Sequence, residues 1–322
     1  MMSLKVYLLA LTGCITIMPI ASASELRINQ IQFVGSHNSY KLAMSSKHFQ
    51  ALRERNPKAA LSLEYHHPPL TKQLNMGLRK LELDIFNTTN FTVGHVQEID
   101  MNSSCSPLAD CFTEIITWSN ANSTHEPIWV SFNAKDAKIP GLPDPTPFDV
   151  DAFNRLDQQI EQYFASRLIR PRDVKRKSDN TPIWPYLHDS RGKFLFILDE
   201  GAEKRRIYEE SWRDRPMFTT SDERAESAAI LIINDPIEHQ KRIRQLVAKG
   251  FMVRTRSDAD TVEARRNDVT RRDLAFESGA QAISTDYYER TNPFDTNYRV
   301  HFGDPIRCNP ISAPKDCQVP HE

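Results

Sequence analysis

The sequence predicts a single α/β domain built as an irregular (β/α)8 barrel of the TIM type. Three observations point to this class: short apolar runs recur along the chain, amphipathic segments with helical spacing lie between several of them, and no internal repeat or long linker divides the chain. Continuous apolar runs are typical of parallel strands covered on both faces. Alternation of such strands with helices over about 250 residues favours a barrel.

The amino-terminal residues 1–23 are predicted to be a secretory signal peptide, and residues 24–322 the mature domain. A single Lys5 precedes an apolar stretch that breaks at Pro19, and the small residues from Ala21 to Ala23 follow. An alternative is a lipoprotein signal in which Cys14 is lipidated, but the apolar stretch continues past Cys14, which favours cleavage near Ala23. We therefore expect a secreted protein, extracellular or periplasmic.

The composition narrows the possible partners. The formal net charge is −1, so no global field attracts nucleic acid, and 39% hydrophobic residues are enough for a substantial core. The mean hydropathy is −0.53, and no long amphipathic stretch carries a basic face. We expect a monomer whose contact with lipid is transient and made by loops at the barrel mouth.

Four cysteines lie outside the leader, in two close pairs. Cys105 is near Cys111, and Cys308 is near Cys317. Export makes the oxidised state available, so two local disulfides are the simplest account. A zinc site is a poor competitor because the histidine spacings fit no common pattern.

The predicted strands are the apolar runs, and they begin with IQFVG in the order of the chain. One pair does not suit a regular barrel: too few residues separate 81–86 from 91–96 for a parallel crossover, so these two segments form a hairpin or one extends the other. The full set is IQFVG (31–35), LELDIF (81–86), FTVGHV (91–96), IWVSF (128–132), KFLFILD (193–199), AILIIND (229–235), FMVRT (251–255) and AQAIS (280–284).

Three helices are predicted between these runs. Residues 147–169 keep one apolar face at a spacing of three and four residues, from Phe153 to Leu168. A second helix begins at Pro236 and ends before Gly250, and a third ends before Gly279.

Chemistry-bearing side chains follow the first two strands. His37 and Asn38 come directly after the first run, at the end of a barrel strand where functional residues lie. Glu82 and Asp84 are two apart in a strand, so both face the same side, toward the barrel mouth. Two carboxylates buried together raise each other's pKa unless a cation lies between them, and a hard divalent ion is the obvious partner.

A second histidine, His95, is predicted on the strand at 91–96, next to Gly94, whose missing side chain would admit a ligand. The structural alternatives are an Arg bridge for Glu82 or Asp84 and a buried structural role for a lone strand histidine. Two histidines, each near possible metal ligands, favour the catalytic interpretation.

These residues stand in motifs that together resemble one family. The chain resembles the catalytic half of calcium-dependent phosphatidylinositol-specific phospholipases C, especially the secreted bacterial and fungal branch. The motifs keep the family's order and span nearly the whole mature chain. They are GSHNSY, HHPPLTKQLNMGLRKLELDIF, VGHV, PIWVSFNAKD, WPYLHDSRGKFLFILD, GFMVRTRSDADTVEARRND and SGAQAISTDYY.

The resemblance implies an irregular (β/α)8 barrel and one bound calcium ion. Asn38, Glu82 and Asp84 match the calcium ligands of the family. The fourth ligand position, a glutamate in the animal enzymes, falls on Asn133, and this loss of charge should weaken calcium binding. Asp136 is a candidate to compensate.

The resemblance also implies that His37 and His95 are the catalytic histidines. In the family the inositol 2-hydroxyl attacks the adjacent phosphodiester, and Ca2+ acidifies that hydroxyl and neutralises the phosphate. The sequence leaves open which histidine is the base and which the acid, and Glu82 is a further candidate base.

The candidate substrate-binding residues are three basic side chains and one aromatic ring. Guanidinium forks fit phosphate oxygens, although ion pairs of the arginines with Asp258 or Asp260 are an equally good explanation. A tyrosine ring in this position either stacks on the sugar or packs in the core. The candidates are Lys135, Arg254, Arg256 and Tyr287.

The function predicted from these residues is a secreted phosphodiesterase acting on phosphatidylinositol or phosphoinositides. It would cleave between glycerol and phosphate and release diacylglycerol and inositol (cyclic) phosphate. A glycerophosphodiester phosphodiesterase is an alternative, but those enzymes follow the first histidine with Arg-Gly, whereas Asn38 and Ser39 follow His37 here. A non-catalytic barrel that binds inositol phosphates or lipid is a third possibility, which the neutral Asn133 encourages.

Overall fold

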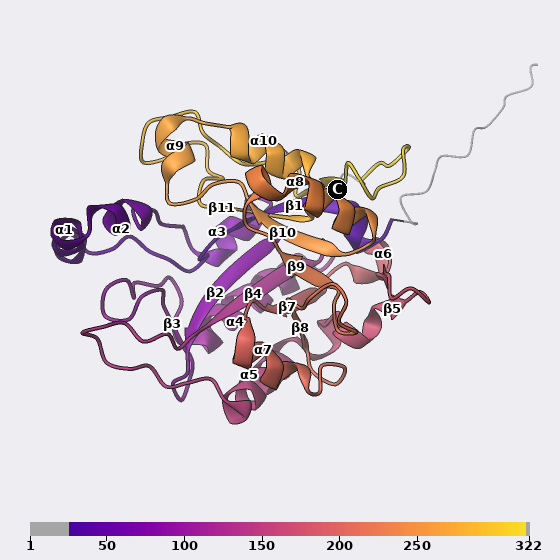
Figure 1. Ribbon diagram of the computed structural model, residues 1–322, viewed down its shortest axis with the longest axis horizontal. Helices are drawn as coiled ribbons and strands as arrows, with labels where there is room; N and C mark the ends of the chain where they lie inside the picture. Colours follow the sequence, from indigo (N-terminus) through magenta and orange to yellow (C-terminus); the bar gives the residue numbers. More distant parts are fainter. Residues whose placement is uncertain (1–25, 320–322) are drawn as a thin grey trace, which may run out of the picture.

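The computed structural model describes residues 26–319, in which eight parallel strands form a nearly closed barrel (Figure 1). The ends of the ladder, β8 and β9, are not paired with each other within residues 26–319, so the barrel is open between them. The predicted fold class is confirmed. Around the ladder the strands are β8 (Met217–Thr219), β7 (Phe194–Leu198), β4 (Ile128–Lys135), β2 (Lys80–Phe86), β1 (Ile31–Ser36), β11 (Ala282–Thr285), β10 (Met252–Arg256) and β9 (Ile230–Ile232).

Seven of the predicted runs supply barrel strands, and the run at 91–96 does not. It contributes β3 (Thr92–Val93), which pairs antiparallel with β2, so the hairpin interpretation is correct. His95 lies beyond the end of β3, and its predicted position on a strand is wrong. The eighth barrel strand is β8, which the sequence patterns missed because its three residues give no readable period.

Short antiparallel elements and helices complete the domain. β12 (Ile306–Cys308) pairs with β1, and β5 (Lys175–Arg176) pairs with β6 (Pro182–Ile183). The helices are α1 (Ser46–Arg55), α2 (Pro57–Ser62), α3 (Leu70–Asn75), α4 (Leu108–Ala121), α5 (Val150–Phe164), α6 (Leu187–Ser190), α7 (Ala202–Glu209), α8 (Pro236–Ala248), α9 (Val262–Arg266) and α10 (Thr270–Glu277).

The three predicted helices form, with ends set by local chemistry. The Asp149 side chain accepts from the Ala152 amide and starts α5, which stops where Ala165 turns to a positive φ of 23°. Helix α8 begins at Pro236, and Gly250 follows its end. No helix within residues 26–319 is both long and apolar enough to cross a membrane.

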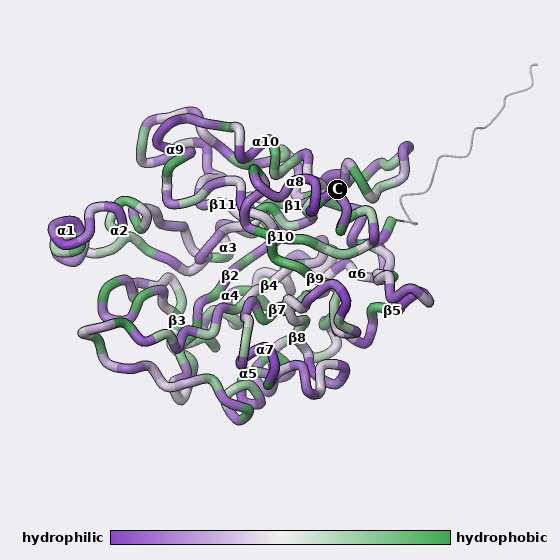
Figure 2. The backbone as a smooth tube through the Cα atoms, in the orientation of Figure 1, coloured by the Kyte–Doolittle hydropathy of each residue, from purple (hydrophilic) through white to green (hydrophobic). Residues whose placement is uncertain are grey.

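The core has an inner and an outer apolar layer. Inside the barrel, Phe33, Trp129 and Met252 belong to a cluster that fills the end away from the mouth. On the outside of β2, Leu81 and Leu83 pack in the cluster that joins the strands to α4 and α5. Figure 2 shows the strands largely hydrophobic, with hydrophilic residues frequent on the surrounding helices and loops. The polar side chains of β2 are therefore left to face the mouth.

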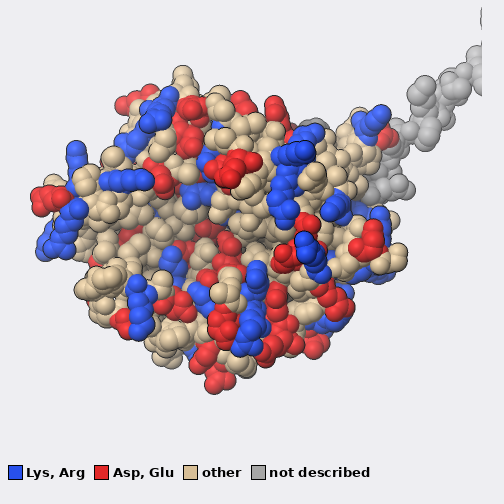
Figure 3. Space-filling view, viewed as in Figure 1, with Lys and Arg blue, Asp and Glu red and all other residues tan. Residues whose placement is uncertain are grey.

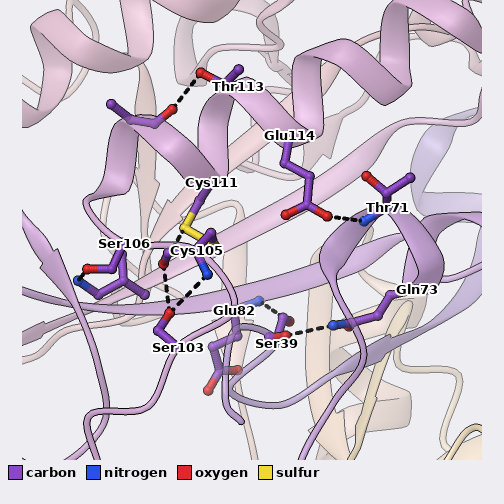
Figure 4. The surroundings of a disulfide bond; sticks show 12 residues. Ser39, Thr71, Gln73, Glu82, Ser103, Cys105, Ser106, Cys111, Thr113 and Glu114 are labelled. Atoms are coloured by element: carbon purple, nitrogen blue, oxygen red, sulfur yellow. Dashed lines mark hydrogen bonds between the residues drawn. A yellow bond between two sulfur atoms is a disulfide. The ribbon is translucent and has the colours of Figure 1, made fainter.

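Both predicted disulfides are present. The bond between Cys105 and Cys111 ties the segment before α4 to its first turn (Figure 4), and the bond between Cys308 and Cys317 closes the carboxyl-terminal loop. The predicted signal peptide and Cys14 lie outside the described residues.

Candidate active site

The site lies where the barrel strands end at their carboxyl termini, and a close approach of β1 and β2 sets its geometry. Gly35 stands opposite Lys80 in the register, and a Cβ atom added at Gly35 would lie 2.2 Å from the Lys80 Cβ. Only glycine permits this separation. The approach brings the chain after β1 against β2, where the Ser39 amide donates to the Glu82 carbonyl at 2.9 Å.

Glu82 is buried inside the barrel among three basic groups. Its Oε2 accepts from Lys80 and, at 2.7 Å, from Arg254 Nη2, while its Oε1 lies 3.6 Å from His37 Nε2. Burial alone raises the pKa of this carboxyl, but Lys80 and Arg254, followed by His37, outweigh it and hold the pKa well below its usual range. Glu82 is therefore a carboxylate and a poor proton acceptor.

Asp84 faces the same side of β2 as Glu82, as the sequence predicted. Its Oδ1 accepts from Asn133 Nδ2 at 2.9 Å, and its Oδ2 lies 3.1 Å from Lys135 Nζ. The same Asn133 nitrogen lies 3.4 Å from Glu82 Oε1, so one amide joins the two carboxylates. The remaining candidate ligand, Asp136, is held by Lys204 at 2.9 Å and does not join this group.

This donor set fits calcium in its chemistry. Carboxylate and amide oxygens are the ligands that Ca2+ takes, and a 180° turn of the Asn133 amide places its oxygen between Glu82 and Asp84. Residues 26–319 hold no cluster of three or more His, Cys, Asp or Glu side chains suited to a metal. The Asn133 amide lies next to both carboxylates and is available as a further oxygen donor. The basic groups on the outer carboxylate oxygens, Lys80, Arg254 and Lys135, already compensate much of the negative charge, which lowers the affinity for a cation.

His37 is framed by partners from two distant strands. Its Nδ1 lies 3.1 Å from Asp286 Oδ1 and 3.5 Å from Arg256 Nη2. Burial lowers the pKa of the His37 imidazole, and the Arg256 charge lowers it further. With the Nδ1 proton directed at Asp286, the Nε2 lone pair is left free on the Glu82 side.

Asp286 is the acid that lies among His37, His67 and Arg256. Burial opposes its ionisation, but His37, and after it His67 and Arg256, bring the pKa of the carboxyl well below its usual range. A second buried acid, Asp258, accepts from the Asp286 amide at 2.9 Å and from Thr285 Oγ1 at 2.5 Å. Asp258 thus fixes the end of β11. Arg254 and Arg256 form their ion pairs with Glu82 and Asp286 rather than with Asp258 or Asp260, the alternative that the sequence left open.

Tyr65 and His67 are further site residues that the sequence interpretation did not identify. His67 Nε2 donates to the His37 carbonyl at 2.8 Å, which leaves Nδ1 to accept from Tyr288 Oη at 3.1 Å. Tyr65 Oη accepts from Asn38 Nδ2 at 2.7 Å, and its ring centroid is 5.8 Å from that of His37. The only signal was the HHPP motif, whose role depends on contacts across the barrel.

The backbone that leads into His95 lies against β2, because the Gly94 amide donates to the Asp84 carbonyl at 3.1 Å. The His95 Nδ1 is 3.1 Å from Asp100 Oδ2. The other oxygen of Asp100 binds the buried Lys41 at 2.9 Å. The side chain of His95 is 18% exposed and that of His37 17% exposed, so solvent reaches both rings.

The expected role of Gly94 is wrong. A Cβ atom at Gly94 would meet the Met101 side chain at 2.4 Å, so Met101 fills the space that was expected to admit a ligand. A side chain at Gly94 would have to displace the flexible end of Met101, and any ligand approaches His95 from its exposed side.

Of the candidate substrate-binding residues, the three basic side chains reach the acids of the site and the tyrosine does not. Arg254 and Arg256 share the inner face of β10, as predicted, and reach Glu82 and Asp286, while Lys135 reaches Asp84. Tyr287 is buried against Phe294 and Tyr298, with ring centroids 5.9 and 6.0 Å away. This surrounding favours the packing alternative, and stacking of Tyr287 on a sugar stays a prediction.

Comparison with known proteins assigns this arrangement to a family. The family model described as phosphoinositide phospholipase C, Ca2+-dependent, matches residues 26–90 and 86–310. The chain belongs to the Ca2+-dependent phosphoinositide phospholipase C family. The resemblance stated from the motifs is confirmed, and with it the enzyme class and the calcium dependence that describes the family. The enzyme therefore acts as a phosphodiesterase on phosphoinositides.

Solved structures support the fold. A calcium-dependent phospholipase C of a Pseudomonas species is 16% identical with a TM-score of 0.57, covering 91% of this chain and 98% of its own. The Streptomyces antibioticus enzyme is 16% identical with a TM-score of 0.52 over 81% and 95%, and the Listeria monocytogenes enzyme 14% identical with 0.53 over 82% and 90%. No curated protein sequence matches the enzyme.

Proposed function

We propose that the enzyme cleaves phosphatidylinositol between glycerol and phosphate through attack of the inositol 2-hydroxyl. One observation supports the proposal: each of the two imidazoles has its own carboxylate partner, and His37 also lies 3.6 Å from Glu82 of β2, while the residue before His95 is bonded to the backbone of Asp84. An in-line transfer requires a base on one side of the phosphorus and an acid on the other, and His37 and His95 are the candidates for these two roles.

His37 is the proposed base. Its pKa is lowered, so the neutral imidazole is present at neutral pH, and its Nε2 is free to take the proton of the 2-hydroxyl. The Asp286 carboxylate then stabilises the imidazolium that forms. Glu82 is less suited to this role because Lys80 and Arg254 hold it ionised and weakly basic.

His95 is the proposed acid. The bond from the 2-oxygen to phosphorus forms while the bond from phosphorus to the glycerol oxygen breaks, and His95 gives its proton to the leaving oxygen. The products are diacylglycerol and inositol cyclic phosphate. Asp100, 3.1 Å from the His95 Nδ1, keeps the ring oriented.

The proposed calcium ligands are Asn38, Glu82, Asp84 and Asn133. When bound there, Ca2+ supplies positive charge that acidifies the hydroxyl and neutralises the phosphate. Lys135, Arg254 and Arg256 are proposed to hold phosphate or inositol oxygens from the same rim. Substitution of the usual charged ligand by Asn133 predicts weak calcium binding.

Secretion as a monomer belongs to the same proposal. Two disulfides in a domain of this size are compatible with an oxidising compartment. The lipid substrate would be met at a membrane surface, with no nucleic acid involved.

The test is an assay of purified residues 24–322 on phosphatidylinositol vesicles with Ca2+, with a chelator, or with Mg2+ in place of Ca2+. We expect inositol cyclic phosphate with Ca2+ and at least about a tenfold loss with chelator. Absence of any inositol phosphate product with millimolar Ca2+ would refute the proposed reaction.

A further inference from the structure

The loop that carries His95 has almost no apolar anchor of its own. This His95 loop runs from Gly94 to Cys105, and within residues 95–104 the only buried residue is Asp100. Burial of apolar side chains usually fixes a loop, but the apolar side chains of this stretch are all at least partly exposed. Other contacts must therefore set the position of the proposed acid.

The His95 loop is paired with the segment that follows the other histidine. That segment, residues 37–43, is called the His37 segment below. An antiparallel bridge joins its Lys41 to Ser103 of the loop. On either side of the bridge a backbone amide of one segment donates to a carbonyl of the other, with N–O distances of 2.8 and 3.0 Å. The two stretches of backbone that bear the histidines therefore hold each other.

A buried ion pair crosses the same contact. Lys41 Nζ lies 2.9 Å from Asp100 Oδ1, and neither side chain is exposed. Figure 3 shows the opposite situation, with charged side chains of both signs spread over one face of the molecule. Ion pairs in contact with solvent contribute little to stability. A buried charge that loses its partner costs much more, so the Lys41 pair permits few arrangements of the loop.

Asp100 passes this constraint on to the imidazole. Its Oδ2 lies 3.1 Å from the His95 Nδ1, and its carbonyl accepts from the His95 amide at 3.0 Å. The ring and the backbone of His95 are thus both bound to one residue. Because Lys41 follows His37 by four residues, a short chain of contacts leads from one histidine to the other.

A disulfide fixes the far end of the loop. Cys105 is bonded to Cys111 in α4 (Figure 4), and both are buried. Helix α4 shares the outer apolar cluster with β2. The Ser103 hydroxyl donates to the Cys105 carbonyl at 2.7 Å and accepts from the Cys105 amide at 3.3 Å. The covalent bond therefore holds Ser103, the bridge residue, in place against the barrel.

We propose that the Lys41–Asp100 pair and the Cys105–Cys111 disulfide form a brace that positions His95 for proton donation to the leaving oxygen. Lys41, Cys105 and Cys111 are positioning residues, because they act on His95 through Asp100 and the loop backbone. The inference rests on the proposed role of His95 as the acid. Without the disulfide the loop is less confined, so His95 spends less time in the geometry that transfers a proton.

The experiment removes this disulfide and compares two substrates in the presence of Ca2+. One is phosphatidylinositol, whose glycerol oxygen needs an acid, and the other is an inositol phosphodiester with a 4-nitrophenol leaving group, which does not. Cys105→Ala combined with Cys111→Ala should lower kcat at least about tenfold on phosphatidylinositol and no more than about twofold on the nitrophenyl substrate. A merely structural role would lower both to the same extent.

Cys308→Ala combined with Cys317→Ala is the matched control. The two disulfides close loops of similar length, with sequence separations of six and nine residues, so their removal should cost similar stability. The control bond lies in the carboxyl-terminal loop and not in the His95 loop. Its removal should therefore leave the ratio of kcat on the two substrates unchanged.

A smaller change guards against a loop that fails to fold. Asn102 is exposed and its Nδ2 donates to the Ala43 carbonyl at 2.9 Å, so Asn102→Ala removes one contact to the His37 segment and empties no packed position. It should lower kcat on phosphatidylinositol by about threefold and leave the nitrophenyl substrate unchanged. Asn120→Ala, at an exposed asparagine of α4 bonded to Arg167, is its control and should change neither.

Steady-state kinetics decide between the outcomes. Equal losses on the two substrates, or no loss on phosphatidylinositol, would overturn the brace. If the variant without the Cys105–Cys111 bond does not fold, the same criteria apply to Asn102→Ala alone. Failure of the unmodified enzyme to cleave phosphatidylinositol would instead overturn the proposed function.

Discussion

The two histidine environments of the mouth reach the same local geometry by different routes. His37 and Asp286 are 249 residues apart, and His95 and Asp100 only five, yet both imidazole Nδ1 atoms lie 3.1 Å from a carboxylate oxygen. The first pair depends on the closure of β1 against β11, and the second on one turn after β3. Only the first contact requires the barrel to form.

The position of the nearest cation distinguishes the two environments chemically. Arg256 approaches the His37 ring itself, at 3.5 Å from Nδ1. Lys41 instead binds the Asp100 oxygen that His95 does not use. The Arg256 cation beside the ring disfavours the imidazolium form of His37. The Lys41 charge instead pairs with the Asp100 carboxylate and does not approach the His95 ring in this way. This difference is the basis for assigning His37 as base and His95 as acid.

The largest expected effect on kcat comes from replacing either histidine. His37→Ala and His95→Ala should each lower kcat on phosphatidylinositol by about 100- to 10,000-fold. On an inositol phosphodiester with a 4-nitrophenol leaving group, His95→Ala should recover to within about tenfold of the unmodified enzyme, since a good leaving group needs no acid. His37→Ala should not recover.

Steady-state kinetics with both substrates check this, and unfolding curves show whether the fold is kept. His188→Ala, at a half-exposed histidine of α6, is the matched control and should behave as the unmodified enzyme. Recovery of His37→Ala alone would reverse the two roles.

Removing either carboxylate partner should lower kcat, and removing Asp100 should also lower the stability of the fold. Asp286→Asn should lower kcat by about 100-fold because the imidazolium loses its counter-charge. Asp100→Asn should lower the free energy of unfolding by about 3 kcal/mol, because it leaves the fully buried Lys41 unpaired. Urea unfolding alongside kinetics measures both. The exposed Asp110→Asn should change neither by more than about 0.5 kcal/mol, and an unaltered stability of Asp100→Asn would contradict the ion-pair argument.

The smallest expected effect is a shift in pH dependence. Activity should rise with pH as His37 loses its proton, with a midpoint below 6.5 because burial and Arg256 lower the pKa of His37. Arg256→Gln removes one of these causes, so the pKa of His37 rises and the midpoint should move up by about one pH unit. Profiles of kcat/KM against pH measure it. Arg242→Gln, at an exposed ion pair, should leave the midpoint in place, and a downward shift with Arg256→Gln would contradict the assignment of His37 as base.

Most of the barrel strands could be predicted from the sequence because they are continuous apolar runs. β8 was not, because its three residues are strand only through pairing with β7. The run at 91–96 gave the opposite error. Its composition is typical of a strand, but only Thr92 and Val93 form one in the structure.

The sequence by itself determined which side chains are candidates for the chemistry, because the strand period places Glu82 and Asp84 on one face and sets His37 at a strand end. Only the tertiary structure decided their charge states. Arg254 reaches Glu82 across 172 residues of chain, and Asp286 reaches His37 across 249. A pKa depends on the charges and the solvent around a group, and the folded barrel brings those neighbours from distant parts of the chain.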